Sequence, residues 1–323
     1  MFKKKSHFIF YTILVLFTLV IGGCSSTSSK SAENKIRNEE VDGNTNKKTK
    51  IVKTVHGDIE IPLDAKRIVV DAYLPTLLLL DKKPVGAAEW DIENVHIQDL
   101  IEGIESTGEV DPETILSLNP DLIISADAEK STFEKLSKIA PTVIIPYETY
   151  KDVYEEVNGL AEILGKEKKA KEWLKTFDED MEKQRARIEK VINEDETVSI
   201  FGLYEKSAYI YGDGIYRGGQ AIYKQLKLTP ADRIKKELMD AGETKKQVSF
   251  EVFNEYAGDY IFLEESSGRE LDKTDSVWNS IDAVKNDHVL YLDPDFFWPY
   301  DPIAVKAQAE EIANMLIEKK KGN

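Results

Sequence analysis

The stretch E-K-K-A-K-E-W-L-K-T-F-D-E-D-M-E-K-Q-R-A-R-I-E-K-V-I-N, residues 167–193, decides how this chain is organised. It contains neither Pro nor Gly, and apolar residues recur along it at helical spacings: Ala170, Leu174, Phe177, Met181 and Ile188. A helix of this length would span about 40 Å, which is more than a compact domain needs. The stretch therefore predicts a helix that bridges two lobes, although one long surface helix of a single domain would show the same pattern.

Short apolar runs alternate with helical patterns on both sides of this helix. Before it, the sequence predicts a strand and turn over residues 51–61, and further strands over 67–71, 85–88, 122–125 and 142–145. After it, we expect strands over 198–203, 208–211, 260–263 and 289–292, and a closing helix over 303–319. Strands that alternate with helices favour parallel α/β units. We therefore predict an α/β fold of two Rossmann-like lobes, with an N-terminal lobe at 51–165, a bridging helix at 166–193 and a C-terminal lobe at 194–323.

The N-terminus has the pattern of a secretory signal. Three lysines precede an apolar run over residues 8–21, and Cys24, the one cysteine of the chain, follows at once. The segment I-G-G-C, residues 21–24, resembles the lipobox of bacterial lipoproteins, in which the cysteine is lipidated after cleavage in front of it. We expect a signal peptide at 1–23 and a flexible polar tether at 24–50, so that a lipid on Cys24 holds the protein at the outer face of the cytoplasmic membrane. A plain secretory signal and an uncleaved membrane helix are the alternatives.

Composition and charge restrict the partners of the folded part. With Cys24 lipidated, no thiol remains for a disulfide, so the fold must be stable through its core. The net charge of −16 makes nucleic acid a poor partner, and an anionic ligand would need a cation placed locally.

The two halves share a local pattern around one glutamate each. Glu113 follows a predicted helix cap at Asp111, Glu251 follows one at Ser249, and each Glu stands eight residues before an Asp that opens a strand. The pattern indicates two lobes of similar design that present one acid each, although helix capping alone accounts for part of it.

An arginine and two groups of aromatic residues are the candidate ligand contacts. Arg217 precedes Gly218 on a loop that enters a helix, and a fixed guanidinium presents a planar fork of donors to anionic oxygens. Aromatic residues, which offer rigid walls with polar handles, gather nearby in the sequence and on a second loop: Tyr209, Tyr211, Tyr216, Phe296, Phe297, Trp298 and Tyr300. Three more follow predicted strands of the first lobe, where loops of α/β folds collect ligands: Tyr73, Trp90 and Tyr147. Ordinary core packing is the competing interpretation for each aromatic residue.

Several segments carry a resemblance to a known family. They are D-P-E-T-I-L-S-L-N-P-D-L-I-I at 111–124, Y-I-Y-G-D-G-I-Y-R-G-G at 209–219, Y-A-G-D-Y-I-F at 256–262 and F-F-W-P-Y-D-P at 296–302. Together with the lipobox and the bridging helix, they resemble the iron-siderophore binding lipoproteins of ABC importers, in particular those for hydroxamates such as ferrichrome and ferrioxamine. The resemblance implies ligand in a shallow cleft between the lobes, with little closure on binding.

The resemblance also implies a role for individual residues. Arg217 would contact the iron-chelating oxygens, Tyr209, Trp298 and Tyr300 would line the cleft beside it, and Glu113 and Glu251 would dock on arginines of the permease. The chain departs from the family at Ile215, where hydroxamate binders often carry Trp, which leaves the native siderophore open; Tyr216 can compensate. We expect a monomer with no cofactor and no protein ligand to the iron, which arrives as an Fe(III)-siderophore complex.

Three other functions are alternatives to a hydroxamate receptor. A receptor of the same fold for ferric citrate or a catecholate siderophore remains open. A haem or bare ferric-ion receptor would need dedicated iron ligands, and the four histidines, His7, His56, His96 and His288, contain no close pair; direct ligation by tyrosines stays open. An enzyme such as a surface hydrolase is disfavoured, because neither G-x-S-x-G nor H-E-x-x-H occurs. An adhesin would show extracellular repeats, which the sequence lacks.

Overall fold

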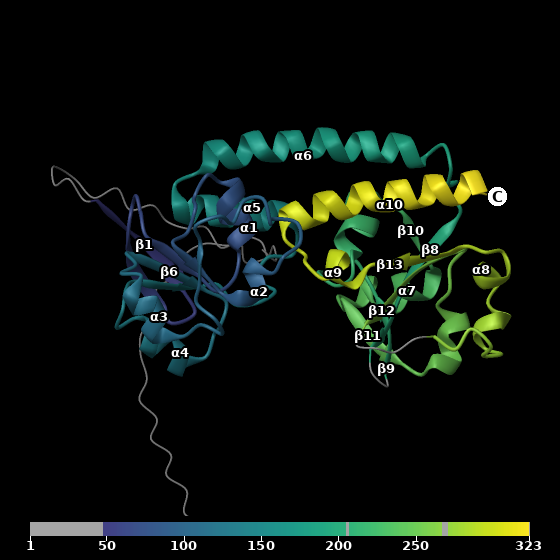
Figure 1. Cartoon of the computed structure of the whole chain (residues 1–323). Coiled ribbons are helices and arrows are strands. Elements are labelled where there is room, and N and C mark those ends of the chain that lie inside the picture. Colours follow the sequence, from purple (N-terminus) through teal and green to yellow (C-terminus); the bar gives the residue numbers. More distant parts are fainter. Residues whose placement is uncertain (1–47, 205–206, 267–270, 323) are drawn as a thin grey trace, which may run out of the picture. The chain divides into compact units, whose positions relative to one another are not determined.

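The computed structural model describes residues 48–204, 207–266 and 271–322 (Figure 1). The predicted signal peptide, Cys24 and the tether up to residue 47 lie outside these ranges. The first strand, β1 (Thr49–Thr54), begins inside the segment predicted as tether and pairs with β2 (Gly57–Pro62) as an antiparallel hairpin. The turn predicted within residues 51–61 is confirmed, since Thr54 pairs with Gly57 and leaves Val55 and His56 between the strands.

The first half of the folded chain contains a five-stranded parallel sheet of order β5-β4-β3-β6-β7. Its strands are β3 (Ile68–Val70), β4 (Gly86–Ala87), β5 (Glu105–Ser106), β6 (Leu122–Ser125) and β7 (Thr142–Ile144). Its helices are α1 (Leu74–Leu79), α2 (Glu89–Ile92), α3 (Pro112–Ser117), α4 (Lys130–Leu136) and α5 (Val153–Leu164). Every residue of β3, β6 and β7 is buried, as expected of a parallel sheet covered on both faces.

The second half contains a mixed sheet of order β11-β9-β8-β12-β13, with β10 paired to β8. Its strands are β8 (Thr197–Tyr204), β9 (Ser207–Tyr211), β10 (Thr229–Pro230), β11 (Lys245–Val248), β12 (Tyr260–Ser266) and β13 (Val289–Leu292). Strands β8, β12 and β13 run parallel, whereas β9 and β11 are antiparallel to their neighbours. Its helical segments are η1 (Gln220–Gln225), α7 (Asp232–Glu237), η2 (Met239–Ala241), η3 (Phe250–Glu255), η4 (Trp278–Ser280), α8 (Asp282–Lys285), α9 (Pro294–Phe297) and α10 (Pro302–Gly322).

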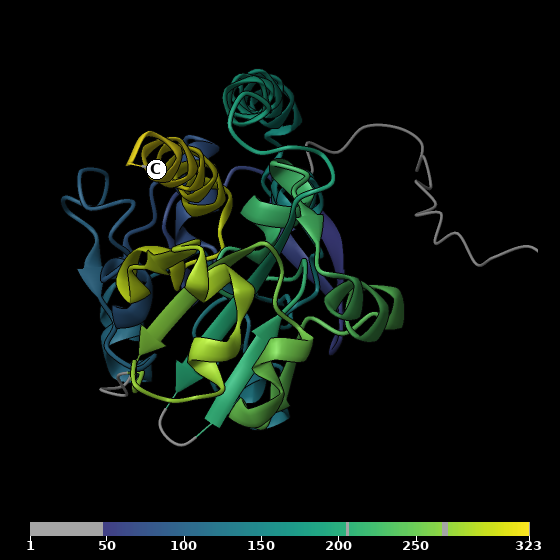
Figure 2. The same ribbon diagram turned by 90° about the vertical axis from the view of Figure 1, so that its right-hand side faces the viewer.

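The predicted bridging helix is α6 (Glu167–Ile188), which connects the elements of the first sheet with those of the second. It ends at Ile188 and not at Asn193, after a last turn that carries Arg185 and Arg187, basic side chains that suit a helix C-terminus. Figures 1 and 2 show α6 beside α10, and Asp180 of α6 forms an ion pair of 2.7 Å with Lys306 of α10. These elements confirm the predicted α/β fold of two Rossmann-like halves joined by a long helix.

The hydrophobic core continues from one half into the other. One cluster of buried side chains joins Leu77 of α1, Phe177 of α6 and Ile312 of α10 to strands of both sheets. No helix in the described part of the chain is both long enough and apolar enough to span a membrane.

Candidate functional site

A cavity of about 620 Å³ lies at the carboxyl ends of the first sheet. Residues that follow every strand of that sheet line it: Asp71 after β3, Trp90 after β4, Glu109 after β5, Asp127 after β6 and Tyr147 after β7. The chain passes from one side of β3 to the other between β5 and β6, and open α/β sheets bind ligands at such a switch point. The second half closes the cavity with residues 298–301, between α9 and α10.

The three aromatic residues predicted for the first half all line this cavity. The Trp90 indole donates a hydrogen bond of 2.9 Å to the Asp71 carbonyl, which fixes a ring that is 51% exposed. Tyr73 has a left-handed backbone at φ 69°, and its hydroxyl donates to the Ile145 carbonyl at 3.2 Å. The Tyr147 ring is 51% exposed. The structure therefore brings the three rings together around one space.

Trp298 and Tyr300 reach the same cavity from the second half. The Asp293 side chain caps α9 by accepting hydrogen bonds from the backbone of Asp295 and Phe296, and α9 ends next to Trp298. The Trp298 side chain is 57% exposed, and the Tyr300 ring meets the Tyr147 ring edge to face, with centroids 5.6 Å apart. Aromatic side chains from both halves therefore face one another across the cavity.

Arg217 lies under the Trp298 ring and is almost completely buried, with 6% of the residue exposed. Its guanidinium carbon is 4.2 Å from the centre of the Trp298 ring, and its Nε donates to Glu264 Oε2 at 2.8 Å. Within the described ranges, its two terminal nitrogens have no hydrogen-bond acceptor. Arg217 does not line the cavity itself; it meets the cavity through Trp298.

The loop that carries Arg217 depends on two glycines. Arg217 and Gly218 both have a left-handed backbone conformation, with φ angles of 50° and 75°. Glycine adopts this conformation without strain, and Gly218 occupies the second of the two positions. A Cβ on Gly219 would stand 2.2 Å from the Gly212 carbonyl oxygen, so no other residue fits there without movement of the backbone. The sequence R-G-G thus sets the arginine against Glu264.

Tyr209 and Tyr216 are partly buried and do not line the cavity. The rings of Tyr209 and Tyr211 stack with centroids 6.2 Å apart, and those of Tyr211 and Tyr216 are 6.3 Å apart. The Tyr216 hydroxyl donates to Glu148 Oε1 at 2.8 Å, which links this loop to the segment after β7. Burial raises the pKa of Tyr211 to about 12, so its hydroxyl stays protonated.

Phe297 does not share the position of its neighbour Trp298. Its side chain is 1% exposed and belongs to the core, where its ring would lie 2.9 Å from a Cβ on Gly218. This buried position suits support of the Arg217 loop better than the ligand contact that the sequence predicts. Ile215, at the position where a Trp was expected, is also buried, at 7% exposure.

Buried carboxyl groups are the part of the site that the sequence did not reveal. Glu264 is fully buried in β12, and its Oε1 has no hydrogen-bond partner among the described residues. Glu264 does not line the cavity, whereas six other acids do, among them Asp71, Asp91, Glu156 and Asp301. A charged residue inside the apolar run of β12 was a signal for Glu264, and an Asp at the end of β3 was one for Asp71. Glu156 lies on an amphipathic helix and gave no signal.

Burial dominates the electrostatics of these acids. It raises the pKa of Asp91 to about 7 and that of Glu156 to about 8, and it also raises the pKa values of Asp71 and Asp301. In the described part of the chain, no group of three or more His, Cys, Asp or Glu side chains is arranged to hold a metal ion.

Glu113 and Glu251 occupy corresponding places in the two halves. Each lies in the first turn of a short helix, α3 and η3, and each is exposed. Asp111 caps α3 with its side chain, whereas Ser249 makes no such bond at the start of η3.

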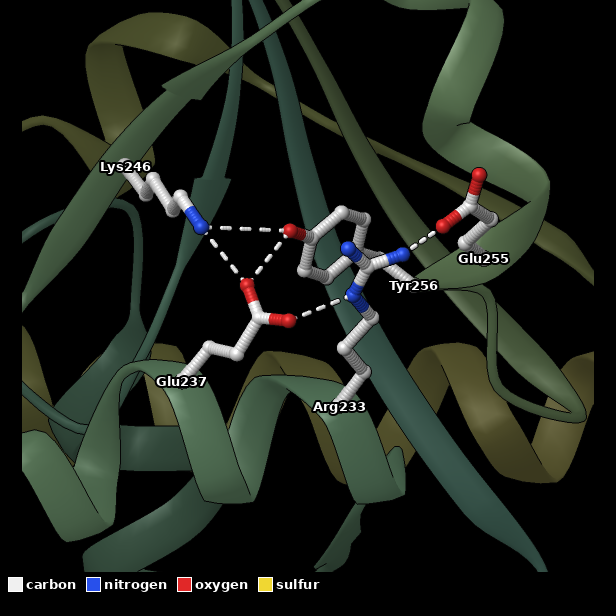
Figure 3. A network of polar contacts seen from close by, with 5 residues as sticks. All are labelled: Arg233, Glu237, Lys246, Glu255 and Tyr256. Atoms are coloured by element: carbon white, nitrogen blue, oxygen red, sulfur yellow. Dashed lines mark hydrogen bonds and ion pairs between the residues drawn. The ribbon is translucent and has the colours of Figure 1, made fainter.

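A polar network holds η3 at its other end (Figure 3). Arg233 pairs with Glu255, the last residue of η3, and donates from Nε to Glu237 at 2.6 Å. Glu237 also accepts hydrogen bonds from Lys246 at 2.6 Å and from the Tyr256 hydroxyl at 2.7 Å, and its donors lower its pKa to about 2. The network therefore fixes the segment that presents Glu251.

Comparisons with known proteins agree with this geometry. The family model for periplasmic binding proteins matches residues 72–296. The iron(3+)-hydroxamate-binding protein YxeB of Bacillus subtilis is 34% identical over 99% of this chain and 99% of its own length. A periplasmic binding protein component of a ferrichrome ABC transporter from Bacillus subtilis has a similar structure, with a TM-score of 0.75, 33% identity, and coverage of 82% of this chain and 99% of that one. FhuD2 from Staphylococcus aureus with bound ferrioxamine B gives a TM-score of 0.70 and 30% identity over 79% of this chain and 99% of that one.

Proposed function

The chain belongs to the periplasmic binding protein family, and we propose that it binds a ferric siderophore of the hydroxamate type and delivers it to an ABC importer. The observation that carries the proposal is the Arg217 guanidinium, held by Glu264 and Trp298 with both terminal nitrogens unpaired among the described residues. The oxygens of a ferric hydroxamate carry partial negative charge and match such a fork of donors. The names of YxeB and FhuD2 refer to the same class of ligand.

Binding would use both halves of the molecule. The chelate would rest on Trp298, with Arg217, Tyr209 and Tyr216 on one side, and Tyr300, Tyr147, Trp90 and Tyr73 would enclose its organic part. Aromatic walls with a few polar groups are typical of small-molecule sites. The iron remains wrapped in its siderophore, so the protein captures cargo and converts nothing.

Location and delivery complete the proposal. Lipid on Cys24 would hold the receptor at the outer face of the cytoplasmic membrane, and segment 24–50 would act as tether. Glu113 and Glu251, one exposed acid in each half, would register the loaded receptor on cationic residues of the permease. Reversing both charges should abolish uptake and leave siderophore affinity unchanged.

Fluorescence quenching of the full chain in mild detergent tests the binding site. The ligands are ferrioxamine B, ferrichrome, ferric citrate, a ferric catecholate and haemin, and the variant is Arg217→Ala. We expect saturable sub-micromolar quenching by a hydroxamate chelate, weakened at least tenfold by the substitution, which corresponds to about 1.4 kcal/mol. Binding of citrate, catecholate or haemin alone would overturn the hydroxamate class, and binding of none would overturn the site.

A further inference from the structure

The wall of the cavity is strongly acidic. Six of its side chains are carboxylic acids and one, Lys135, is a base; the acids are Asp71, Asp91, Glu109, Asp127, Glu156 and Asp301. Lys135 is exposed, whereas Asp71, Glu156 and Asp301 are buried to at least nine tenths. The ionisable groups that solvent screens least are therefore all carboxyl groups.

Arg217 does not offset this acidity. Its side chain is 7% exposed and pairs at 2.8 Å with Glu264, whose side chain is 0% exposed. The pair is neutral as a unit and stands behind Trp298. The carboxyl groups of the wall are therefore not balanced by a buried cation inside the cavity.

Two of the cavity acids have an oxygen available for a ligand. Glu156 Oε1 accepts a hydrogen bond from the Thr76 hydroxyl at 2.5 Å, and Asp91 Oδ2 accepts one from the Leu74 backbone at 3.2 Å. Within the described residues, Glu156 Oε2 and Asp91 Oδ1 have no hydrogen-bond partner. Oxygens that accept, at the wall of an enclosed space, fit a ligand group that donates.

The other two buried acids are already satisfied. Asp301 accepts from the Asn94 amide at 2.8 Å and from the backbone of Ile303 and Ala304 at the start of α10, and Asp71 accepts from the Ser125 hydroxyl and from the Ala126 backbone. All four are ionisable groups of the wall, and Glu156 and Asp91 also have open oxygens. No metal-binding group occurs among the described residues, so an organic cation is the better match.

We propose that this cleft selects ferric hydroxamates that carry a protonated amine, with the iron chelate at Arg217 and Trp298 and the ammonium group in the cavity against Glu156 and Asp91. The inference rests on the proposed function and narrows it. Trp298 connects the two subsites, because it contacts Arg217 and also lines the cavity. Anionic ferric chelates gain no ion pair with these carboxyl groups and bind less tightly.

Burial of the acids fits this use. Because burial raises the pKa of Glu156 to about 8 and that of Asp91 to about 7, both groups are largely or partly protonated at neutral pH without ligand. An ammonium group beside them favours their ionised form, so cation binding releases protons. Binding of a neutral analogue releases none.

A series of three ligands with one iron core tests the inference. Ferrioxamine B carries a terminal amine, its N-acetyl derivative is neutral there, and its N-succinyl derivative is anionic. With the full chain in mild detergent, we expect ferrioxamine B to bind at least tenfold more tightly than the acetyl form, and the acetyl form at least tenfold more tightly than the succinyl form. Calorimetry in two buffers of different ionisation enthalpy should detect proton release with ferrioxamine B alone.

The double variant Glu156→Gln with Asp91→Asn assigns the effect to these side chains. The double variant should bind the acetyl form as tightly as the unchanged protein does. Its affinity for ferrioxamine B should lie within about threefold of its affinity for the acetyl form. Glu162→Gln is the matched control, because Glu162 lies exposed on the same helix and does not line the cavity. Unchanged affinity for the acetyl form also shows that the double variant is folded.

The outcomes separate this inference from the proposed function. Equal affinity for the three ligands, or a preference for ferrioxamine B that survives the double variant, overturns the inference while hydroxamate binding stands. Failure of all three ligands to bind overturns the proposed function itself.

Discussion

The two halves of the molecule share a frame and differ in what they bring to the cleft. In the first half, the Asp121 carboxylate accepts hydrogen bonds from the backbone of Lys66 and Arg67 at 2.8 and 3.0 Å, just before β3. In the second half, Asp259 does the same for Thr197 at 2.7 Å, at the start of β8. The common arrangement lies at the amino ends of the inner strands, away from the cavity.

The opposite ends of the strands carry the difference. The first sheet is wholly parallel and brings residues from all five strand ends to the cavity, several of them acids. The mixed second sheet contributes the buried Arg217–Glu264 pair and the residues around Trp298. The two halves therefore repeat the contacts at the amino ends of their inner strands. The residues proposed to contact the ligand differ between the halves and lie mainly in loops.

The largest effect is expected from breaking the ion pair of the second half. Glu264→Ala leaves Arg217 charged and unpaired under Trp298, so we expect the free energy of unfolding to fall by about 3–5 kcal/mol. Urea unfolding measures it. Glu264→Gln keeps an acceptor and should cost less.

A double replacement separates stability from binding. Arg217→Met with Glu264→Leu removes both charges, and we expect it to recover most of the lost stability while siderophore binding stays lost. A stable Glu264→Ala protein with full affinity would contradict the role given to the pair.

The acids of the first half should make stability depend on pH. Burial raises the pKa of Glu156 from 4.5 to about 8, so the folded state holds this proton more tightly than the unfolded state does. Its stabilising contribution is complete below pH 4.5 and is lost as the pH rises through 8, with a slope of at most about 1.4 kcal/mol per pH unit.

Urea unfolding between pH 5 and 9 checks this slope. Glu156→Gln should flatten the profile and raise the stability at pH 9, whereas Glu162→Gln should leave the profile unchanged. An identical slope in Glu156→Gln and the unchanged protein would show that the residue is not held as described.

The shared frame predicts matching losses in the two halves. Asp121→Ala and Asp259→Ala each remove the acceptor of backbone groups at the start of an inner strand, so each should cost about 1–2 kcal/mol of unfolding free energy. Exposed Asp240, which makes no such bond, is the control, and its replacement by Ala should stay within about 0.5 kcal/mol. If only one of the two variants lost unfolding free energy, the two halves would not share this stabilising contact.

The smallest expected effect concerns the ring that joins the two subsites. Trp298→Ala removes the stacking on Arg217 and part of the cavity wall, and we expect hydroxamate affinity to fall about tenfold with little change in stability. Trp298→Phe should lose less, because a ring remains over the guanidinium. Titration of both variants with ferrioxamine B measures the difference.

Buried apolar runs made most of the fold predictable. The strands Leu122–Ser125 and Val289–Leu292 begin and end where the sequence places them, because each is a short and mostly apolar run. The edge strands Glu105–Ser106 and Lys245–Val248 were missed because they are short or polar and mostly exposed, so they carry no hydrophobic pattern.

The candidate site was only partly predictable for a related reason. Trp90 was identified because loops after strands collect ligands, and Trp298 because it stands in a group of aromatic residues; both line the cavity. The pairing of Arg217 with Glu264 joins residues that are 47 positions apart, and only the packing of β12 brings them together. The burial of Glu156 depends likewise on α5 facing α1, which no local pattern encodes.

A crystal structure of the complex with ferrioxamine B, with the iron located by anomalous scattering, tests the central claim most directly. We predict the iron beside Trp298 with no protein side chain coordinated to it, hydroxamate oxygens within hydrogen-bond distance of the terminal nitrogens of Arg217, and the ligand amine near Glu156. Iron bound directly by tyrosine side chains, or a ligand seated away from both Arg217 and the acid-lined cavity, would contradict the account.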